Sequence, residues 1–225
     1  MPRTADHESR RAQITTGVRE LALASGLGAV TIAGTAKAAG ISVGLVQHYY
    51  DSKESLLADT LGRLLGDIED RVDAAIIRAE RDHARIEHML GAGLLELLPL
   101  SPTHRDETYL RHAFAGLALD NPALAEHQRA FDRRLRDRIA QAVKNGVECG
   151  EVTAKTDGLL ESEAALAVTQ GLAVRLLIDP DEAVRTRARA VIASQMAGVF
   201  VGRCAKESQP PTRTDPTEPW RCPPS

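Results

Sequence analysis

The side chains best suited to chemistry lie in residues 31–50, TIAGTAKAAGISVGLVQHYY. Thr31 and Ser42 each precede a short helical segment, and a hydroxyl at that position typically caps a helix N-terminus. Gly40 lies between the two segments, where glycine permits a sharp bend. Two short helices joined in this way are typical of a helix-turn-helix, whose second helix enters the major groove of DNA. The hydroxyl caps would be suitable phosphate ligands.

The distribution of charge and a search for catalytic motifs help to decide between a DNA-binding protein and an enzyme. Residues 1–53 carry slightly more basic than acidic side chains, whereas the rest of the chain is net acidic. Glu80 and His83 form one E-x-x-H, but a di-iron bundle needs two copies and two further glutamates. Gly26 and Gly28 begin a G-x-G in which Thr31 occupies the third glycine position, and neither H-E-x-x-H nor G-x-x-x-x-G-K occurs. We therefore expect no enzymatic activity, no metal site and no cofactor.

The elements that must position these side chains are helices. Apolar residues recur every three or four positions, and Ala, Leu, Glu and Arg dominate. Proline, glycine and polar turns mark the ends of the segments. We predict an all-α fold with about nine helices. Their expected ranges are 8–25, 31–39, 42–49, 53–80, 83–98, 103–119, 122–149, 158–178 and 181–206.

Composition restricts the class of protein further. The 225 residues are 43% hydrophobic and 26% charged, and no apolar run approaches the roughly 18 residues that span a bilayer. We expect a cytoplasmic protein with no membrane contact. Cys149, Cys204 and Cys222 form no C-x-x-C pair and are expected to be isolated reduced thiols. Residues 207–225 hold six of the 11 prolines and are predicted to be a disordered tail.

Two segments of the chain follow a known family pattern, RRAQI at 10–14 and AVTIAGTAKAAGISVGLVQHYYDSKESLL at 29–57. Through them the chain resembles the tetracycline-repressor (TetR) family of bacterial transcriptional regulators. The resemblance implies a homodimeric repressor that binds a palindromic, double-stranded operator and is released by a small-molecule inducer. It also implies a helix-turn-helix DNA-binding domain at 1–52 and a ligand-binding and dimerisation domain at 53–206.

The resemblance also assigns roles to single residues of the DNA-binding domain. Thr31 corresponds to a cap that contacts phosphate, and Tyr49 and Lys53 match positions that commonly contact the phosphate backbone. The exposed turn of the recognition helix would comprise Ser42, Val43, Gly44, Gln47 and His48. Two residues depart from the family pattern. Thr35 replaces a core isoleucine, and Gln47 replaces a tyrosine and could pair with adenine. Tyr50 is either a core aromatic or a further contact residue.

The long helices between residues 57 and 178 should enclose the inducer site. Residues that combine apolar bulk, space and a few polar tips are Met89, Gly93, Leu97, Tyr109, His112, Phe114, Leu117, Phe131 and Leu135. The alternative is that they are plain core. The segment GLAVRLLIDPDEAVRTRA resembles the choline-responsive branch of the family, but Ala173 replaces a tryptophan of that branch. Choline sensing is therefore not expected.

The last two predicted helices are the candidates for dimerisation. Small and apolar side chains recur along them at Ala164, Ala167, Val168, Gly171, Leu172, Val184, Ala188, Val191, Ile192 and Gln195. Paired across a two-fold axis, they would form a four-helix interface. The alternative is a core face within one chain. Two other classes of protein stay open, an architectural DNA-binding protein without ligand sensing and an all-helical enzyme.

Overall fold

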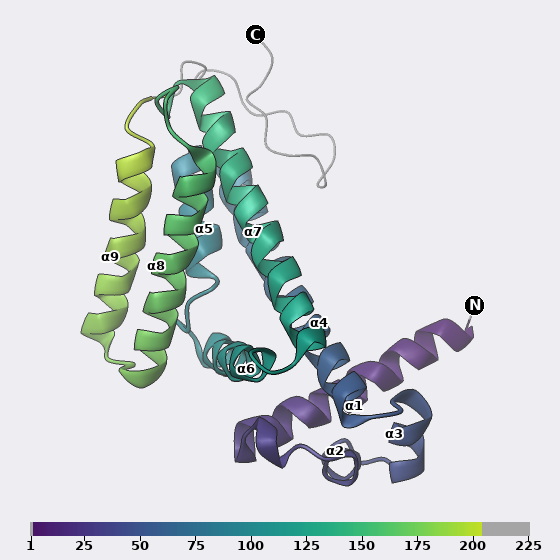
Figure 1. Ribbon diagram of the computed structural model, residues 1–225. Coiled ribbons are helices and arrows are strands. Elements are labelled where there is room, and N and C mark those ends of the chain that lie inside the picture. Colours follow the sequence, from purple (N-terminus) through teal and green to yellow (C-terminus); the bar gives the residue numbers. More distant parts are fainter. Residues whose placement is uncertain (1, 204–225) are drawn as a thin grey trace. The chain divides into compact units, whose positions relative to one another are not determined.

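The computed structural model describes residues 2–203, and the predicted tail at 207–225 lies outside that range. The described residues form nine α-helices and one 3-10 turn, so the all-α prediction is confirmed (Figure 1). The helices span Pro2–Ser25 (α1), Ile32–Ala38 (α2), Val43–Tyr49 (α3), Lys53–Arg81 (α4), Ile86–Leu95 (α5), Pro102–Ala118 (α6), Pro122–Cys149 (α7), Gly158–Ile178 (α8) and Glu182–Val199 (α9), and the 3-10 turn covers Leu27–Ala29 (η1). None of the described helices is both long and apolar enough to cross a membrane.

The predicted caps form at both helices of the helix-turn-helix. The hydroxyl of Thr31 accepts a hydrogen bond from the Gly34 amide at 3.0 Å, and that of Ser42 accepts one from the Leu45 amide at 3.2 Å. Each satisfies an amide that has no partner inside its own helix. Gly40 has φ 66°, a left-handed conformation that glycine adopts at little cost.

Four predicted helix boundaries are wrong by three residues or more. Helix α1 begins at Pro2 instead of 8, and α5 ends at Leu95 instead of 98. The other two differ for local reasons. Helix α5 begins at Ile86 instead of 83, because His83 has φ 55° and ends α4 in a left-handed turn. The Ala84 amide closes that turn on the Ala79 carbonyl at 3.0 Å. Helix α9 ends at Val199 instead of 206. Beyond it the Gly202 amide bonds the Glu151 carbonyl at 2.9 Å, which draws the chain away from the helix axis.

The chain divides into two compact units. Within the described residues, one unit comprises 2–67 and 109–130, and the other comprises 68–108 and 131–203. Helix α4 contributes to both units because the division falls after Asp67. The domain boundary predicted at residue 53 stays a prediction.

In the first unit, α1 packs closely on α2. Ile14, Val18 and Ala22 recur on one face of α1 and are fully buried. A Cβ on Gly17 would lie 2.9 Å from the Ala39 amide nitrogen, so only glycine permits this approach. The Gln13 side chain donates to the Ala39 carbonyl at 2.9 Å. These interactions place the bend between α2 and α3.

In the second unit, α9 packs against α5 and α8 (Figure 1). Val184, Ala188 and Ile192 face this core and are at most 5% exposed. The prediction that they lie in a dimer interface is therefore wrong, because their spacing of four residues matches the face that α9 buries in its own chain. Val191 is exposed and Gln195 is half-buried.

Cys149 also differs from its prediction. It is disulfide-bonded, so the expectation of three reduced thiols is wrong for this residue. Cys149 ends α7 and is 2% exposed. The bond from Gly202 to Glu151 brings sequence-distant backbone close to this end of α7, a proximity that cysteine spacing cannot reveal. Cys204 and Cys222 lie outside the described residues.

Thr35 occupies the core position where the resemblance implied an isoleucine. Its side chain is fully buried, and its hydroxyl has no hydrogen-bond partner in the described part of the chain. A buried hydroxyl without a partner loses its hydrogen bonds to water and gains none in return. The small DNA-binding unit therefore carries an avoidable cost in its core.

Replacing Thr35 with valine should raise the free energy of unfolding by about 1 kcal/mol, because valine keeps the shape and removes the unsatisfied hydroxyl. Urea denaturation followed by circular dichroism measures the change. Thr60→Val is the matched control, since Thr60 is equally buried but its hydroxyl donates to the Leu56 carbonyl at 2.8 Å. An equal gain in both variants would show that the hydroxyl of Thr35 carries no cost.

Candidate functional site

The predicted recognition helix, α3, presents one exposed face. Val43, Gly44, Gln47 and His48 are exposed, whereas Val46 is fully buried. Residues three and four apart share a helix face, so the exposed four form one surface beside the exposed cap Ser42. The helix has only seven residues. It therefore offers one short face to a partner.

Ser42 also lies in the pentapeptide GISVG, which matches the G-x-S-x-G around the nucleophilic serine of many hydrolases. That nucleophile stands between a strand and a helix, on a strained turn. Here helix α2 precedes the serine, which has φ −75° and caps α3. Its hydroxyl accepts from the Leu45 amide. The motif therefore serves helix capping in this fold.

A cluster of polar side chains fixes the C-terminal end of α3. Tyr50 is 4% exposed and donates its hydroxyl to Asp59 of α4. Arg63 donates to the same carboxylate at 3.2 Å and also to Glu8 of α1 at 2.6 Å. The Arg11 guanidinium lies 5.7 Å from the centre of the Tyr50 ring. Tyr50 is thus a core aromatic that joins α3 to α1 and α4.

Tyr50 and Glu8 are two of the groups whose pKa the environment of this cluster shifts. Burial, followed by the hydrogen bond to Asp59, raises the pKa of the Tyr50 hydroxyl, which stays a donor at neutral pH. The hydrogen bond from Arg63 lowers the pKa of Glu8. Both shifts keep the cluster in the protonation states that its hydrogen bonds require.

The predicted phosphate-contacting residues flank this cluster. Tyr49 is half-buried, and its ring meets the edges of His7 and His48 at centroid distances of 5.5 and 5.3 Å. The Lys53 ammonium lies 3.4 Å from the Gly28 carbonyl, a contact that leaves other N–H donors of the ammonium for a further acceptor. Thr31 is exposed at the start of α2.

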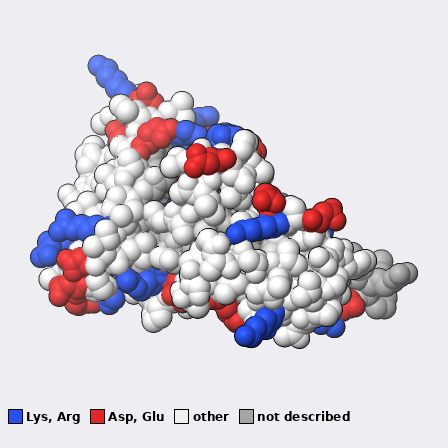
Figure 2. Space-filling model, turned by 60° about the horizontal axis from the view of Figure 1, so that its bottom comes forward, with Lys and Arg blue, Asp and Glu red and all other residues white. Residues whose placement is uncertain are grey.

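Lys37 is an exposed cation of α2 that was not among the predicted contact residues. Its position in the AKAAG motif, in the last turn of α2, is the sequence feature that could have indicated it as a contact residue. On the face drawn in Figure 2, Lys and Arg side chains are separated by uncharged surface and by Asp and Glu.

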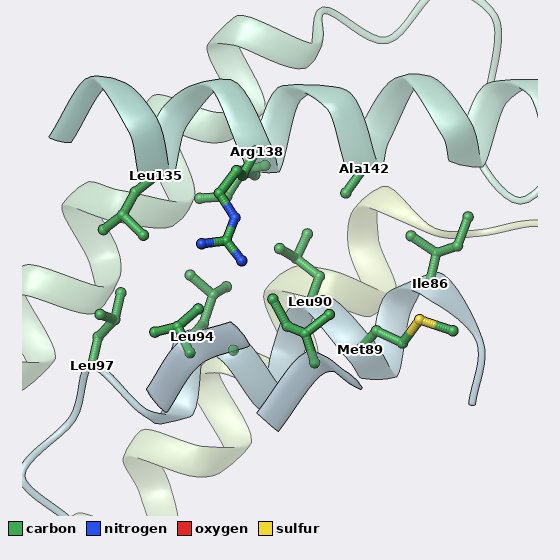
Figure 3. A pocket seen from close by; sticks show the side chains of 12 residues that line it. Ile86, Met89, Leu90, Leu94, Leu97, Leu135, Arg138 and Ala142 are labelled. Carbon is green, nitrogen blue, oxygen red and sulfur yellow. The ribbon is translucent and has the colours of Figure 1, made fainter. Parts of the chain in front are cut away.

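A cavity lies in the second unit among α4, α5 and α7 (Figure 3). Its volume is about 510 Å³, counting the part that is open to solvent. Eleven apolar residues and one charged residue line it: Val72, Ile76, Ile86, Met89, Leu90, Gly93, Leu94, Leu97, Leu135, Arg138, Ile139 and Ala142. An apolar wall with few polar groups is typical of small-molecule sites.

Three of the eight predicted ligand-binding residues, Met89, Gly93 and Leu97, line this cavity, as does Leu135. Gly93 also permits close packing, since a Cβ there would lie 3.0 Å from the Ile76 side chain. The structure does not place the other five predicted residues on the cavity wall: Tyr109, His112, Phe114, Leu117 and Phe131. The first four belong to the other compact unit. Phe114 and Phe131 are fully buried core residues.

Arg138 and several aliphatic residues of this wall were not predicted. The aliphatic ones repeat at helical spacing on α5, as in Ile86, Leu90 and Leu94, and resemble ordinary core in sequence. Arg138 lies in a charged stretch, 132–138, that is typical of a solvated helix face. Only the packing of α7 on α4 and α5 reveals which of its arginines reaches the cavity.

Comparison with known proteins finds two family models that match the chain. Residues 14–60 match the model of bacterial regulatory proteins of the tetR family. Residues 85–201, more than half of the chain, match the model of the BetI-type transcriptional repressor C-terminal domain. The first match contains both helices of the helix-turn-helix, and the second contains most of the cavity wall.

Curated relatives agree with these matches. The transcriptional regulator PksA of Bacillus subtilis (strain 168) is 25% identical over 205 residues, which cover 89% of this chain and 95% of PksA. The transcriptional regulator BetI of Burkholderia mallei (strain NCTC 10229) is 32% identical over 142 residues, covering 62% of this chain and 70% of BetI.

Solved structures share the fold. A transcriptional regulator from Rhodococcus sp. Rha1 superposes with a TM-score of 0.74 at 22% identity, covering 86% of this chain and 97% of that one. A regulator from Saccharomonospora viridis in complex with choline gives 0.70 at 21% identity, covering 83% and 95%. With its capped helix-turn-helix and its helical C-terminal part, the chain belongs to the TetR family of ligand-responsive, DNA-binding transcriptional regulators, with a C-terminal domain of the BetI repressor type.

Proposed function

We propose that this chain is a cytoplasmic repressor that binds a palindromic operator as a homodimer and is released by a small-molecule inducer. The observation that carries the proposal is the exposed face of α3, held in place by the buried Tyr50 cluster at its C-terminal end. Two such helices related by a two-fold axis would enter successive major grooves, about 34 Å apart. The operator would then contain inverted half-sites at that spacing.

In this proposal, Gln47 and His48 recognise the bases. Both side chains are exposed on α3 beside Gly44, whose missing side chain lets the helix backbone approach the bases. Thr31, Ser42, Tyr49 and Lys53 would contact phosphates around this helix. Phosphate contacts orient the protein, and base contacts determine the sequence that it prefers.

The proposed dimer interface is the outer face of α8. Leu160, Ala167, Gly171, Val174 and Ile178 are exposed and, with the half-buried Ala164, repeat alternately at four and three residues. This spacing forms a straight seam along a helix pair. Its small central residues permit close approach of a symmetry-related α8. The predicted residues Val168 and Leu172 lie beside the seam and are half-buried.

Induction would act through α4. This continuous helix of 29 residues begins at Lys53, holds Asp59 of the Tyr50 cluster, and carries Val72 and Ile76 on the cavity wall. A ligand that moves these wall residues would move the helix that supports α3. An operator of fixed spacing would then lose contacts although α3 keeps its own structure. Choline, which one structural neighbour binds, is not proposed, because no aromatic residue lines the cavity.

Gly44→Ala should separate DNA contact from folding. A Cβ at Gly44 meets no atom within 4 Å, and alanine favours a helix over glycine by about 0.5–1 kcal/mol. Stability should therefore rise, whereas operator affinity should fall because the methyl group stands on the face that approaches the bases. Chemical denaturation and fluorescence anisotropy measure the two effects.

Gly66→Ala provides the control for this variant. Gly66 lies in α4 of the same unit, and its Cβ would also be in open space. It should gain similar stability without any change in DNA affinity. Unchanged operator binding in Gly44→Ala would contradict the proposed orientation of α3.

Gln47→Ala should change the sequence preference of DNA binding, whereas Lys53→Ala should change the general affinity for DNA. Loss of the Gln47 amide should reduce preference at one base pair by about 1–3 kcal/mol. Loss of the Lys53 ammonium should weaken binding to all sequences and reduce the salt slope of log K by about one. Anisotropy titrations on operator variants at several salt concentrations test both. The residue assignments fail if both substitutions change only the general affinity.

Gly171→Glu should convert the dimer into monomers. A Cβ at Gly171 is in open space within one chain, so the subunit should fold, but two carboxylates would meet across the proposed two-fold axis. Analytical ultracentrifugation at micromolar concentration gives the mass. Gly116→Glu is the control, because Gly116 of α6 is exposed and equally open, and it should stay dimeric. A dimeric Gly171→Glu protein would place the interface elsewhere.

A further inference from the structure

The cavity of the second unit has one polar feature that restricts what it can bind. Eleven of its twelve lining residues are apolar, and the twelfth is Arg138. The Arg138 guanidinium projects from α7 into the space between Leu90 and Leu94 of α5 (Figure 3). A ligand within this wall would therefore meet hydrocarbon on most sides and a positive charge at one place.

The hydrogen-bonding capacity of Arg138 is only partly used within residues 2–203. Its Nη2 donates to the carboxylate of Asp73 on α4. Its other N–H groups have no partner among residues 2–203. The Asp73 side chain is 50% exposed and can return to water at little cost. A planar guanidinium can also bind a second carboxylate with its remaining N–H donors.

The preceding turn of α7 shows that this arrangement is particular to position 138. Arg134 lies one turn earlier and binds Glu69 of α4 at 2.7 Å, in the same way that Arg138 binds Asp73. Arg134 does not line the cavity, and its side chain is 52% exposed. Two equivalent ion pairs thus join α7 to α4, and one of their arginines reaches the ligand space.

We propose that the inducer is a small organic acid with an apolar body, whose carboxylate binds Arg138 while its hydrocarbon part packs among Met89, Leu90, Leu94 and Ile139. This inference rests on the proposed function and assigns the chemical class of its ligand. Apolar walls favour hydrocarbon in proportion to the area removed from water. The charged wall residue favours an anion over a neutral molecule and opposes a cation. A quaternary ammonium would meet Arg138 without any aromatic ring to bind it.

Three probes of equal chain length separate these possibilities: octanoate, 1-octanol and octyltrimethylammonium. Isothermal titration calorimetry on the full-length protein should give the tightest binding for octanoate, about tenfold or more above 1-octanol, as expected of a hydrogen bond to a charged group. The ammonium probe should bind most weakly. Equal affinities, preference for the cation, or no binding of octanoate at millimolar concentration would overturn the proposal.

Arg138→Met should reduce octanoate affinity to that of 1-octanol and leave 1-octanol binding unchanged. Arg134→Met is the matched control and should leave the binding of octanoate as it is. Arg138→Lys keeps the charge and should retain part of the preference for octanoate, and it also serves if Arg138→Met does not fold. An equal loss in the Arg134 and Arg138 variants would show that the α7–α4 ion pairs act only on stability.

Operator binding without ligand is measured on the same samples. A protein that binds operator DNA but not octanoate contradicts the ligand class alone. A protein that binds octanoate through Arg138 but binds no DNA contradicts the proposed repressor function alone. Release of operator by octanoate, lost in Arg138→Met and kept in Arg134→Met, is the result expected if both proposals hold.

Discussion

A single apolar stripe along α4 supports both the recognition helix α3 and the cavity of the second unit. Leucines at three- and four-residue spacing bury the first half of the helix, and the stripe continues through Ile68 to Val72 and Ile76. Burial of each such side chain contributes about 1.5–3 kcal/mol. Leu56, Leu61 and Leu64 are fully buried, so this part of α4 is fixed by its neighbours. The same stripe then reaches the cavity, where packing is incomplete.

The recognition helix depends on its neighbours more than on its own sequence. A helix of seven residues is too short to be stable alone in water. Its start is held by the Ser42 cap, and its end by the bond from Tyr50 to Asp59. The close approach at Gly17 fixes α2 on α1. Buried contacts thus hold α3 from behind and leave its opposite face free.

The cavity has the apolar wall of a small-molecule site. The family to which the chain belongs consists of ligand-responsive regulators. The apolar wall of the cavity supplies affinity without much selectivity, because hydrocarbon surfaces discriminate poorly among molecules of similar size. Selectivity must then come from its one charged residue. Arg138 is positioned by Asp73, which makes α4 a partner of both the ligand-facing charge and the DNA-binding unit. In the proposed function, α4 would couple ligand binding to DNA release.

Local patterns in the sequence were sufficient for the number and order of the helices and for the exposed face of α3. The period of apolar residues predicted α7 and α8 to the residue, and the hydroxyl caps at Thr31 and Ser42 marked the starts of α2 and α3. These features depend on hydrogen bonds and spacings within a few residues of chain. The exposed positions of α3 follow from the same short-range geometry.

Only the tertiary structure decided which buried faces meet and where they leave space. Met89 and Phe114 have similar surroundings in sequence, yet one lines the cavity and the other is closed core in a different unit. Ile192 and Val191 are adjacent, but α9 buries the first in its own chain and exposes the second. Arg138 differs from Arg134 only by one turn of α7. Helical periodicity tells which side of a helix is buried, whereas the neighbour that buries it depends on packing between residues far apart in the chain.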